Sequence, residues 1–170
     1  MAVGYSDALE IEDRSDNPVD LIEIVATGND WSFERSGEDE IAITVKGQWA
    51  EYDVSMSWIA DFEALHLACA FEFKVPEKRK TEVMRLLSLV NEQLLIGHFD
   101  VWEQESVVMF RQTLLLSGGA EPTGAQVEAL LASALEACER YYQAFQFVVW
   151  SGFDARRAVD CAHFETQGTA

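Results

Sequence analysis

The sequence predicts an α+β fold: an antiparallel sheet, made of a four-stranded meander plus a hairpin, with helices packed on one face. Apolar and polar residues alternate with a period of two in short segments between residues 31 and 73. The connections between these segments are too short for parallel crossovers, which need about a dozen residues or more. Segments with helical spacing of apolar residues lie before, between and after the strands.

The start of the chain predicts a short helix that follows a polar arm. Residues 1–16 are polar and acidic, and we expect them to form a flexible N-terminal arm. Asn17 or Asp16 is suited to cap the helix, Pro18 suits its first position, and Gly28 ends it. No linker or repeat divides the rest of the chain. We therefore expect residues 17–166 to form a single domain.

Six segments are predicted as strands: 31–35, 41–46, 51–58, 65–73, 99–102 and 107–116. The third has the clearest alternation, which is typical of a strand with one face in the core and one in water. In the fourth, His66, Ala68 and Ala70 lie opposite an apolar face. Residues 114–116 are all leucine, so we expect the end of the last strand to be covered on both faces.

A helix is predicted from Pro76 to a stop at Gly97, between the fourth and fifth strands. Its apolar stripe consists of Val83, Leu86, Leu87, Val90 and Leu94, widened by Met84, Leu89 and Leu95. So wide a stripe is typical of a helix with two neighbours, such as the sheet and a second helix or subunit. Asn91 is a polar residue beside the stripe. We expect its side chain to form a local hydrogen bond to the backbone near the helix end.

Two more helices are predicted after the hairpin. Thr123 and Gln126 match a capping box, which opens the longest helix. An apolar stripe continues from Val127 to Trp150, and Ser151-Gly152 breaks it. A weaker helix follows around residues 155–162.

Charge and cysteine content restrict the partners and the compartment. The chain has 30 acidic and 12 basic residues, for a net charge of −18. An acidic surface repels phosphate backbones and anionic lipids, so we expect no nucleic-acid partner and no membrane partner. The start lacks the features of a signal peptide, and no apolar run is long enough to span a bilayer. Three widely spaced cysteines suit reduced thiols, and we expect a cytoplasmic protein.

The search for chemistry gives no catalytic, cofactor-binding or metal-binding residues, and we expect neither an enzyme nor a cofactor. Gly118-Gly119 lacks the pattern of a phosphate-binding loop. Cys69 and Cys138 lie on apolar faces and are predicted as core residues. Cys161 and His163 supply at most one ligand pair, whereas zinc needs three or four ligands. The remaining candidates are His66, and His98 with Asp100 on one strand face.

Two surface features are candidates for contacts. Trp102 lies opposite Phe99 and Val101 on its strand, and it is the preferred candidate for a contact surface among the five tryptophans. Lys78-Arg79-Lys80 is the only basic run. We interpret it as a solvated face, with contact to an acidic partner as the alternative.

Several motifs are shared with a known family: Asn17-Pro18, Trp31-Ser-Phe33-Glu-Arg35, Val90-Asn91-Glu92 with Ile96-Gly97-His98-Phe99, Met109-Phe110-Arg111, and Ala144-Phe145-Gln146-Phe147-Val148. With this order of elements, the chain resembles the YbjN family of bacterial proteins, labelled sensory transduction regulators, over about residues 17–153. The resemblance implies a fold similar to that of type III secretion chaperones, which are small, acidic, dimeric α+β proteins. The family has no catalytic motif, so no functional residues are carried over.

The leading hypothesis is a non-enzymatic regulatory or chaperone-like module that binds an unidentified protein. We expect a homodimer, built partly from the second face of the helix around Met84 to Leu95 or from a sheet edge. The alternative is a small-molecule-binding domain or enzyme with a pocket between sheet and helices, where His66, His98 or Asp100 would converge. A structural subunit of a larger assembly is a third possibility.

Overall fold

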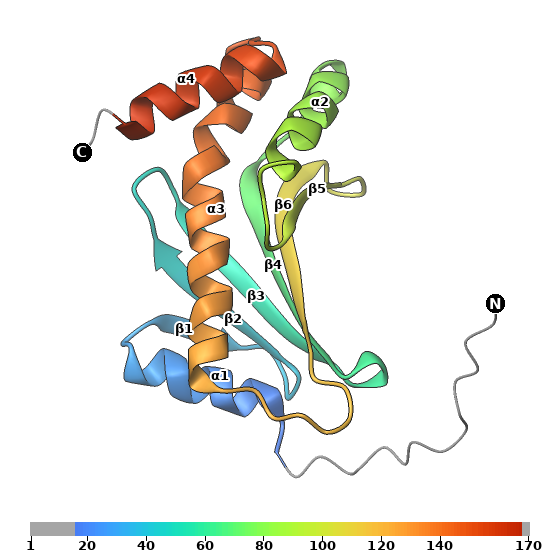
Figure 1. The fold of residues 1–170 in the computed structure, drawn as a ribbon, viewed down its shortest axis with the longest axis vertical. Helices are drawn as coiled ribbons and strands as arrows, with labels where there is room; N and C mark the ends of the chain where they lie inside the picture. The colour runs from blue at the N-terminus through green and yellow to red at the C-terminus, as the bar shows by residue number, and fades with distance from the viewer. Residues whose placement is uncertain (1–15, 168–170) are drawn as a thin grey trace, which may run out of the picture.

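A six-stranded antiparallel sheet, ordered β1-β2-β3-β4-β6-β5, organises the chain (Figure 1). The computed structural model describes residues 16–167, with side chains described up to residue 164. The strands are β1 Ser32–Arg35, β2 Glu40–Lys46, β3 Glu51–Ile59, β4 Ala64–Lys74, β5 His98–Trp102 and β6 Val107–Leu115. The helices are α1 Pro18–Gly28, α2 Lys80–Asn91, α3 Gly124–Trp150 and α4 Ala155–Gln167. The predicted fold class is confirmed, including the meander of β1 to β4. The hairpin joins the meander through β6, which leaves β1 and β5 as the edges.

The helices cover one face of this sheet. α3 crosses that face and packs on β4 and β6, while α1 lies across β1, β2 and β3 beside the start of α3 (Figure 1). α4 packs on α2 and on α3. Alternate residues of each strand point into the core below the helices, because successive side chains in a strand point to opposite faces. The other face of the sheet has no helix over it within residues 16–167.

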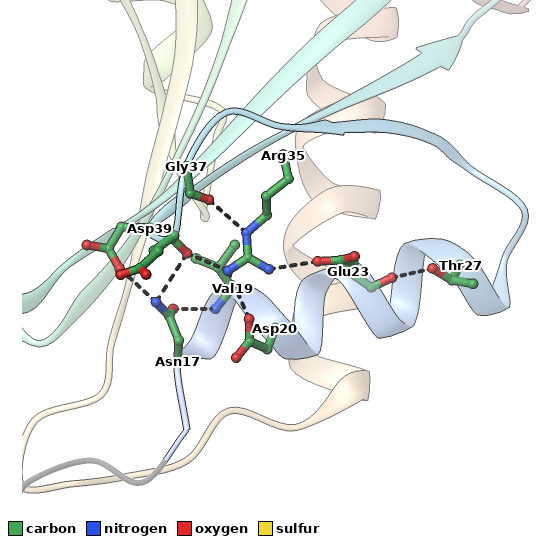
Figure 2. Close-up of polar contacts among 9 residues, drawn as sticks. Asn17, Val19, Asp20, Glu23, Thr27, Arg35, Gly37 and Asp39 are labelled. Carbon is green, nitrogen blue, oxygen red and sulfur yellow. Dashed lines mark hydrogen bonds and ion pairs between the residues drawn. The ribbon is translucent and has the colours of Figure 1, made fainter.

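A polar network joins α1 to the β1–β2 turn (Figure 2). The Asn17 side chain caps α1 by accepting from Val19 N at 3.0 Å, and its amide donates to Asp39 at 2.7 Å. The Arg35 guanidinium pairs with Asp20 at 2.8 Å and with Glu23 at 2.7 Å, and it also donates to backbone carbonyls of the turn. The predicted cap at Asn17 is confirmed. The predicted arm, residues 1–16, lies outside the described residues except for Asp16.

The predicted helix from Pro76 to Gly97 is too long at both ends. A 3₁₀ turn, Glu77–Arg79, precedes α2, and α2 ends at Asn91. Beyond Asn91 the backbone bonds change to i→i+3, because Gln93 N donates to Val90 O and Leu94 N to Asn91 O. The apolar spacing continues to Leu94 although the helix does not, and Leu95 is 97% exposed.

The prediction that the end of β6 is covered on both faces was wrong. Leu116 is buried and Leu114 is half-buried, but Leu115 points to the helix-free face and is 67% exposed. The capping box at Thr123 and Gln126 is confirmed, as is the break at Gly152, which has a φ of 69°. In the last helix, Ala155, Ala158, Val159 and Ala162 are buried.

Gly97 turns the chain into β5 at a position where a side chain would not fit. Its φ is 70°, and a Cβ there would clash with the Phe110 ring and lie 2.9 Å from Arg111 O. Gly118 has a similar φ of 76°, but a Cβ at that position would have nothing within 4 Å. A side chain at Gly118 would have only the cost of a positive φ, whereas a side chain at Gly97 would have that cost and a steric clash. Substitutions at the two glycines can therefore separate the two contributions to stability.

We expect Gly97→Ala to lower the free energy of unfolding by about 2–4 kcal/mol, because left-handed strain and overpacking add at this site. Gly118→Ala is the matched control and should cost about 1 kcal/mol, from backbone strain alone. Urea unfolding followed by circular dichroism measures both values. Equal losses in the two variants would contradict the clash at Gly97.

Candidate protein-binding surface

The helix-free face of the sheet contains a hollow with a volume of about 540 Å³, lined by both apolar and polar side chains. One row across the sheet consists of Ser55, Ala68, Arg111 and His98, which are register partners on successive strands. The hollow is lined by Glu40, Asp53, Ser55, His66, Ala68, Ala70, Asp100, Val101, Trp102, Met109 and Arg111. We call this set the open-face hollow. Ala68 and Ala70 of β4 are small, whereas Met109 and Arg111 of the neighbouring strand β6 have longer side chains.

His66, Arg111 and Asp100 meet in the open-face hollow. Arg111 Nε donates to His66 Nε2 at 3.2 Å, and Arg111 Nη1 lies 3.8 Å from Asp100 Oδ2. His98 is the register partner of Arg111. The sequence-based alternative required these side chains to converge in a pocket between sheet and helices. They converge, but on the opposite face of the sheet.

Burial lowers the pKa of His66, and the positive charge of Arg111 and the proximity of His98 lower it further. The imidazole therefore favours its neutral form and can accept the hydrogen bond from Arg111 Nε. Asp100 partly compensates the guanidinium charge from the other side. The arrangement orients Arg111 across the sheet and supplies no activated nucleophile.

The edge of β5 is capped by side chains. Asn91 Oδ1 accepts from Phe99 N at 2.8 Å, and Asn91 Nδ2 donates to Phe99 O at 3.0 Å. Asp100 Oδ1 accepts from Val101 N at 2.8 Å. Asn91 bonds to the backbone as predicted, but the predicted place near the helix end was wrong, because its partner is Phe99 on the edge strand. These contacts occupy polar groups that an added strand would otherwise use.

Three groups of exposed apolar side chains are candidates for contacts: one borders the hollow, one lies around α2 and one lies at the end of α3. Trp102 is 46% exposed on the helix-free face, as its position opposite Phe99 and Val101 predicted. Leu95 and Ile96 are exposed in the loop between α2 and β5, and Met84 is 43% exposed on α2. Trp150 at the end of α3, which the sequence did not single out, is 62% exposed, and its ring centroid lies 5.2 Å from that of Phe73. The other three tryptophans are half-buried against the core.

The remaining sequence candidates have structural roles. Arg79 donates to Val148 O and Phe153 O, where it satisfies carbonyls at the end of α3. Lys80 pairs with Glu103. The basic run is thus only partly a solvated face, because Arg79 and Lys80 tie elements together. Backbone N–H groups of Gly118 and Gly119 donate to the Glu63 carboxylate at 3.1 and 3.2 Å.

The predicted core position of Cys69 and Cys138 is confirmed, and Cys161 is half-buried on α4. In the part of the chain that the structure describes, no three His, Cys, Asp or Glu residues lie together as metal ligands would. Of the helices between residues 16 and 167, none combines the length and the apolar character that crossing a membrane requires.

We expect Asn91→Ala to destabilise the fold by about 1–3 kcal/mol, because it leaves the Phe99 N–H and C=O without partners. It should also cause concentration-dependent association through the uncapped β5 edge. Asn91→Asp is the companion variant: it can still accept from Phe99 N, but its second carboxylate oxygen would repel Phe99 O, so it should lose stability while keeping the Phe99 N–H bonded. Urea unfolding and sedimentation velocity measure the two effects. An Asn91→Ala variant that equals the parent in both would contradict the capping role.

Comparison with known proteins identifies the family. The family model YbjN, described as "Putative bacterial sensory transduction regulator", matches residues 18–147. Among curated proteins no sequence matches the chain. One similar solved structure is the ExsC–ExsE complex, at 19% identity over 74% of this chain and 93% of that chain, with a TM-score of 0.51. Another is YbjN from E. coli, at 14% identity over 70% and 84% of the two chains, with a TM-score of 0.52.

The solved structures that resemble this chain agree with the fold described above. At such low identity, the solved structures establish the fold, which is the α+β architecture of type III secretion chaperone-like proteins. The family model spans α1 to most of α3, including the capped β5 edge and the open-face hollow. The motifs that suggested the family from the sequence lie within or at the border of that match. The chain belongs to the YbjN family.

Proposed function

We propose that this protein is a non-enzymatic regulatory or chaperone-like module that binds another protein and acts as a homodimer. The observation that carries the proposal is the open-face hollow, where the exposed Trp102 lies beside the half-buried Met109 and alanines on a sheet face without helices. Tryptophan at the border of a shallow apolar site is typical of residues that dominate protein interfaces.

The family and the fold support this proposal. The family is described as sensory transduction regulators, and one structural neighbour is a complex of two proteins, ExsC and ExsE. The free cysteines support a reducing compartment, so we propose a cytoplasmic location. We also propose that residues 17–166 act as one domain, since buried residues from α1 to α4 form one continuous core cluster.

The partner is tested with a photo-crosslinking amino acid at Ala70, which is exposed in the open-face hollow, and at Ala132, which is exposed on α3. The two probes lie on opposite sides of the molecule, so Ala132 controls for random collisions. In living cells of the source organism, the probe at Ala70 should capture one protein reproducibly, identified by mass spectrometry. Capture of the same proteins at equal yield from both positions, or none from either, would contradict a partner site on this face.

The candidate residues for a homodimer interface are the exposed apolar side chains beside α2. Leu95 and Ile96 are 97% and 56% exposed, although they follow a helix whose other face is buried. The β5 edge next to them is capped by Asn91, so strand pairing is disfavoured there. The sequence suggested the second face of the helix around Met84 to Leu95 or a sheet edge. We favour the first surface, extended by the exposed Ile96, over the capped β5 edge.

We expect Leu95→Glu to convert the dimer into a monomer, because a carboxylate cannot be buried in an apolar interface without a partner. Phe62→Glu is the matched control, since Phe62 is 73% exposed in the turn between β3 and β4. Light scattering coupled to size exclusion measures the mass at concentrations up to the high micromolar range. A monomeric parent protein, or loss of the dimer in the Phe62→Glu control alone, would contradict this surface.

A second candidate function is binding of a small molecule in the open-face hollow. Its volume of about 540 Å³ lies within the usual range of ligand sites, and His66, Arg111 and Asp100 would orient a polar ligand there. The photo-crosslinking experiment separates the two functions, because a small-molecule site captures no protein at Ala70.

A further inference from the structure

The open-face hollow combines an apolar floor with an acidic border. Ala68 and Ala70 of β4 form the floor, and Met109 and Trp102 stand along one side. Glu40 and Asp53 stand along the other side, on β2 and β3. The hollow can therefore contact apolar side chains of a partner on its floor and positively charged side chains of a partner along its acidic border.

The two border carboxylates are available for a partner. Glu40 accepts from Ser55 Oγ at 3.2 Å and Asp53 accepts from Thr44 Oγ1 at 2.7 Å, so each is held by one hydroxyl group. No basic side chain in the described part of the chain forms an ion pair with either one. Asp100 differs, because Arg111 lies 3.8 Å from it. The net charge of −18 strengthens the attraction of this face for a cation.

The shape of the hollow suits a helix better than an extended strand. The middle of a sheet face presents side chains only, and an extended peptide needs backbone groups at an open edge. The nearer edge, β5, is capped by Asn91 and by Asp100. Along β4 the hollow extends from His66 to Ala70, about 13 Å at the rise of a strand. That length matches about nine residues of α-helix, so a helix of 14 residues covers it.

We propose that the open-face hollow binds a basic amphipathic helix of a partner protein, with its apolar stripe on Ala68, Ala70 and Met109 and its lysine or arginine side chains toward Glu40 and Asp53. A basic side chain on the opposite flank would lie beside the exposed Trp102 ring, where a cation is also favoured. This inference rests on the proposed function and specifies the chemistry of the partner.

The first test uses three synthetic 14-residue peptides with the full-length protein: a leucine–lysine amphipathic helix, its leucine–glutamate counterpart, and a scrambled leucine–lysine sequence. Fluorescence anisotropy should show that the amphipathic basic peptide binds at least about tenfold more tightly than the other two. Equal binding of the scrambled peptide would overturn the proposal, because it would reflect the net charge alone.

The second test locates the binding. Ala68→Arg fills the floor of the hollow, and Ala132→Arg adds the same charge on the exposed side of α3. Ala68→Arg should weaken binding of the basic amphipathic peptide at least about tenfold, and Ala132→Arg less than twofold. Equal weakening by both would show binding through diffuse charge and would overturn the proposal. Circular dichroism confirms that both variants are folded before the comparison.

The third test concerns the border charges. The double variant Glu40→Gln/Asp53→Asn should weaken peptide binding about threefold, the order expected for two exposed ion pairs. It should also flatten the dependence of affinity on salt. The control Glu92→Gln/Glu136→Gln removes two exposed carboxylates away from the hollow and should leave both measurements almost unchanged. Similar effects in the two double variants would overturn the role of the border.

The outcomes separate this inference from the proposed function. If the photo-probe at Ala70 captures a protein while the basic peptide fails every test, the hollow binds a partner of different chemistry, and only this inference fails. If Ala68→Arg turns a dimer into a monomer, the occupant is a second copy of the chain, which also overturns it. Support requires the peptide preference and the difference between Ala68→Arg and Ala132→Arg together.

Discussion

The packing of Phe71 against aromatic rings from three other elements is the interaction on which the fold depends. Its ring centroid lies 5.0 Å from that of Tyr142 and 5.7 Å from that of Phe145, both on α3. Tyr52 of β3 and Phe99 of β5 lie at 6.4 and 5.9 Å. Tilted and edge-on pairs of this kind contribute beyond the burial of apolar area. The cluster joins α3 to strands that are not neighbours in the sheet.

This packing commits one face of the sheet to the core and leaves the other for contacts. Because successive side chains alternate, burying Phe71 on β4 places Ala68 and Ala70 on the opposite face. Their small size makes that face concave, and Trp102 and Arg111 reach it by the same alternation from β5 and β6. The core and the open-face hollow thus both follow from the alternation of side chains along the strands.

The motifs of the YbjN family acquire structural explanations. Asn91 caps the backbone of Phe99, and Gly97 adopts a positive φ where a side chain would strike the Phe110 ring. Arg35 and Asn17 anchor α1 to the β1–β2 turn. Asn91, Arg35 and Asn17 pair with backbone or charged groups, and Gly97 permits a tight turn, so each of these motif residues stabilises the fold.

The sequence by itself determined the fold class, the order of elements and the buried stripes of α3 and α4, because periodicity and capping are local properties. It did not determine where α2 ends, because the helical spacing of apolar residues continues to Leu94. The helix ends at Asn91, whose side chain binds the backbone of a strand located further along the chain. It also placed His66, His98 and Asp100 on strand faces without showing which face was shared. Only the tertiary structure decided that they meet Arg111 on the helix-free side, because strand order and register depend on contacts between residues far apart in sequence.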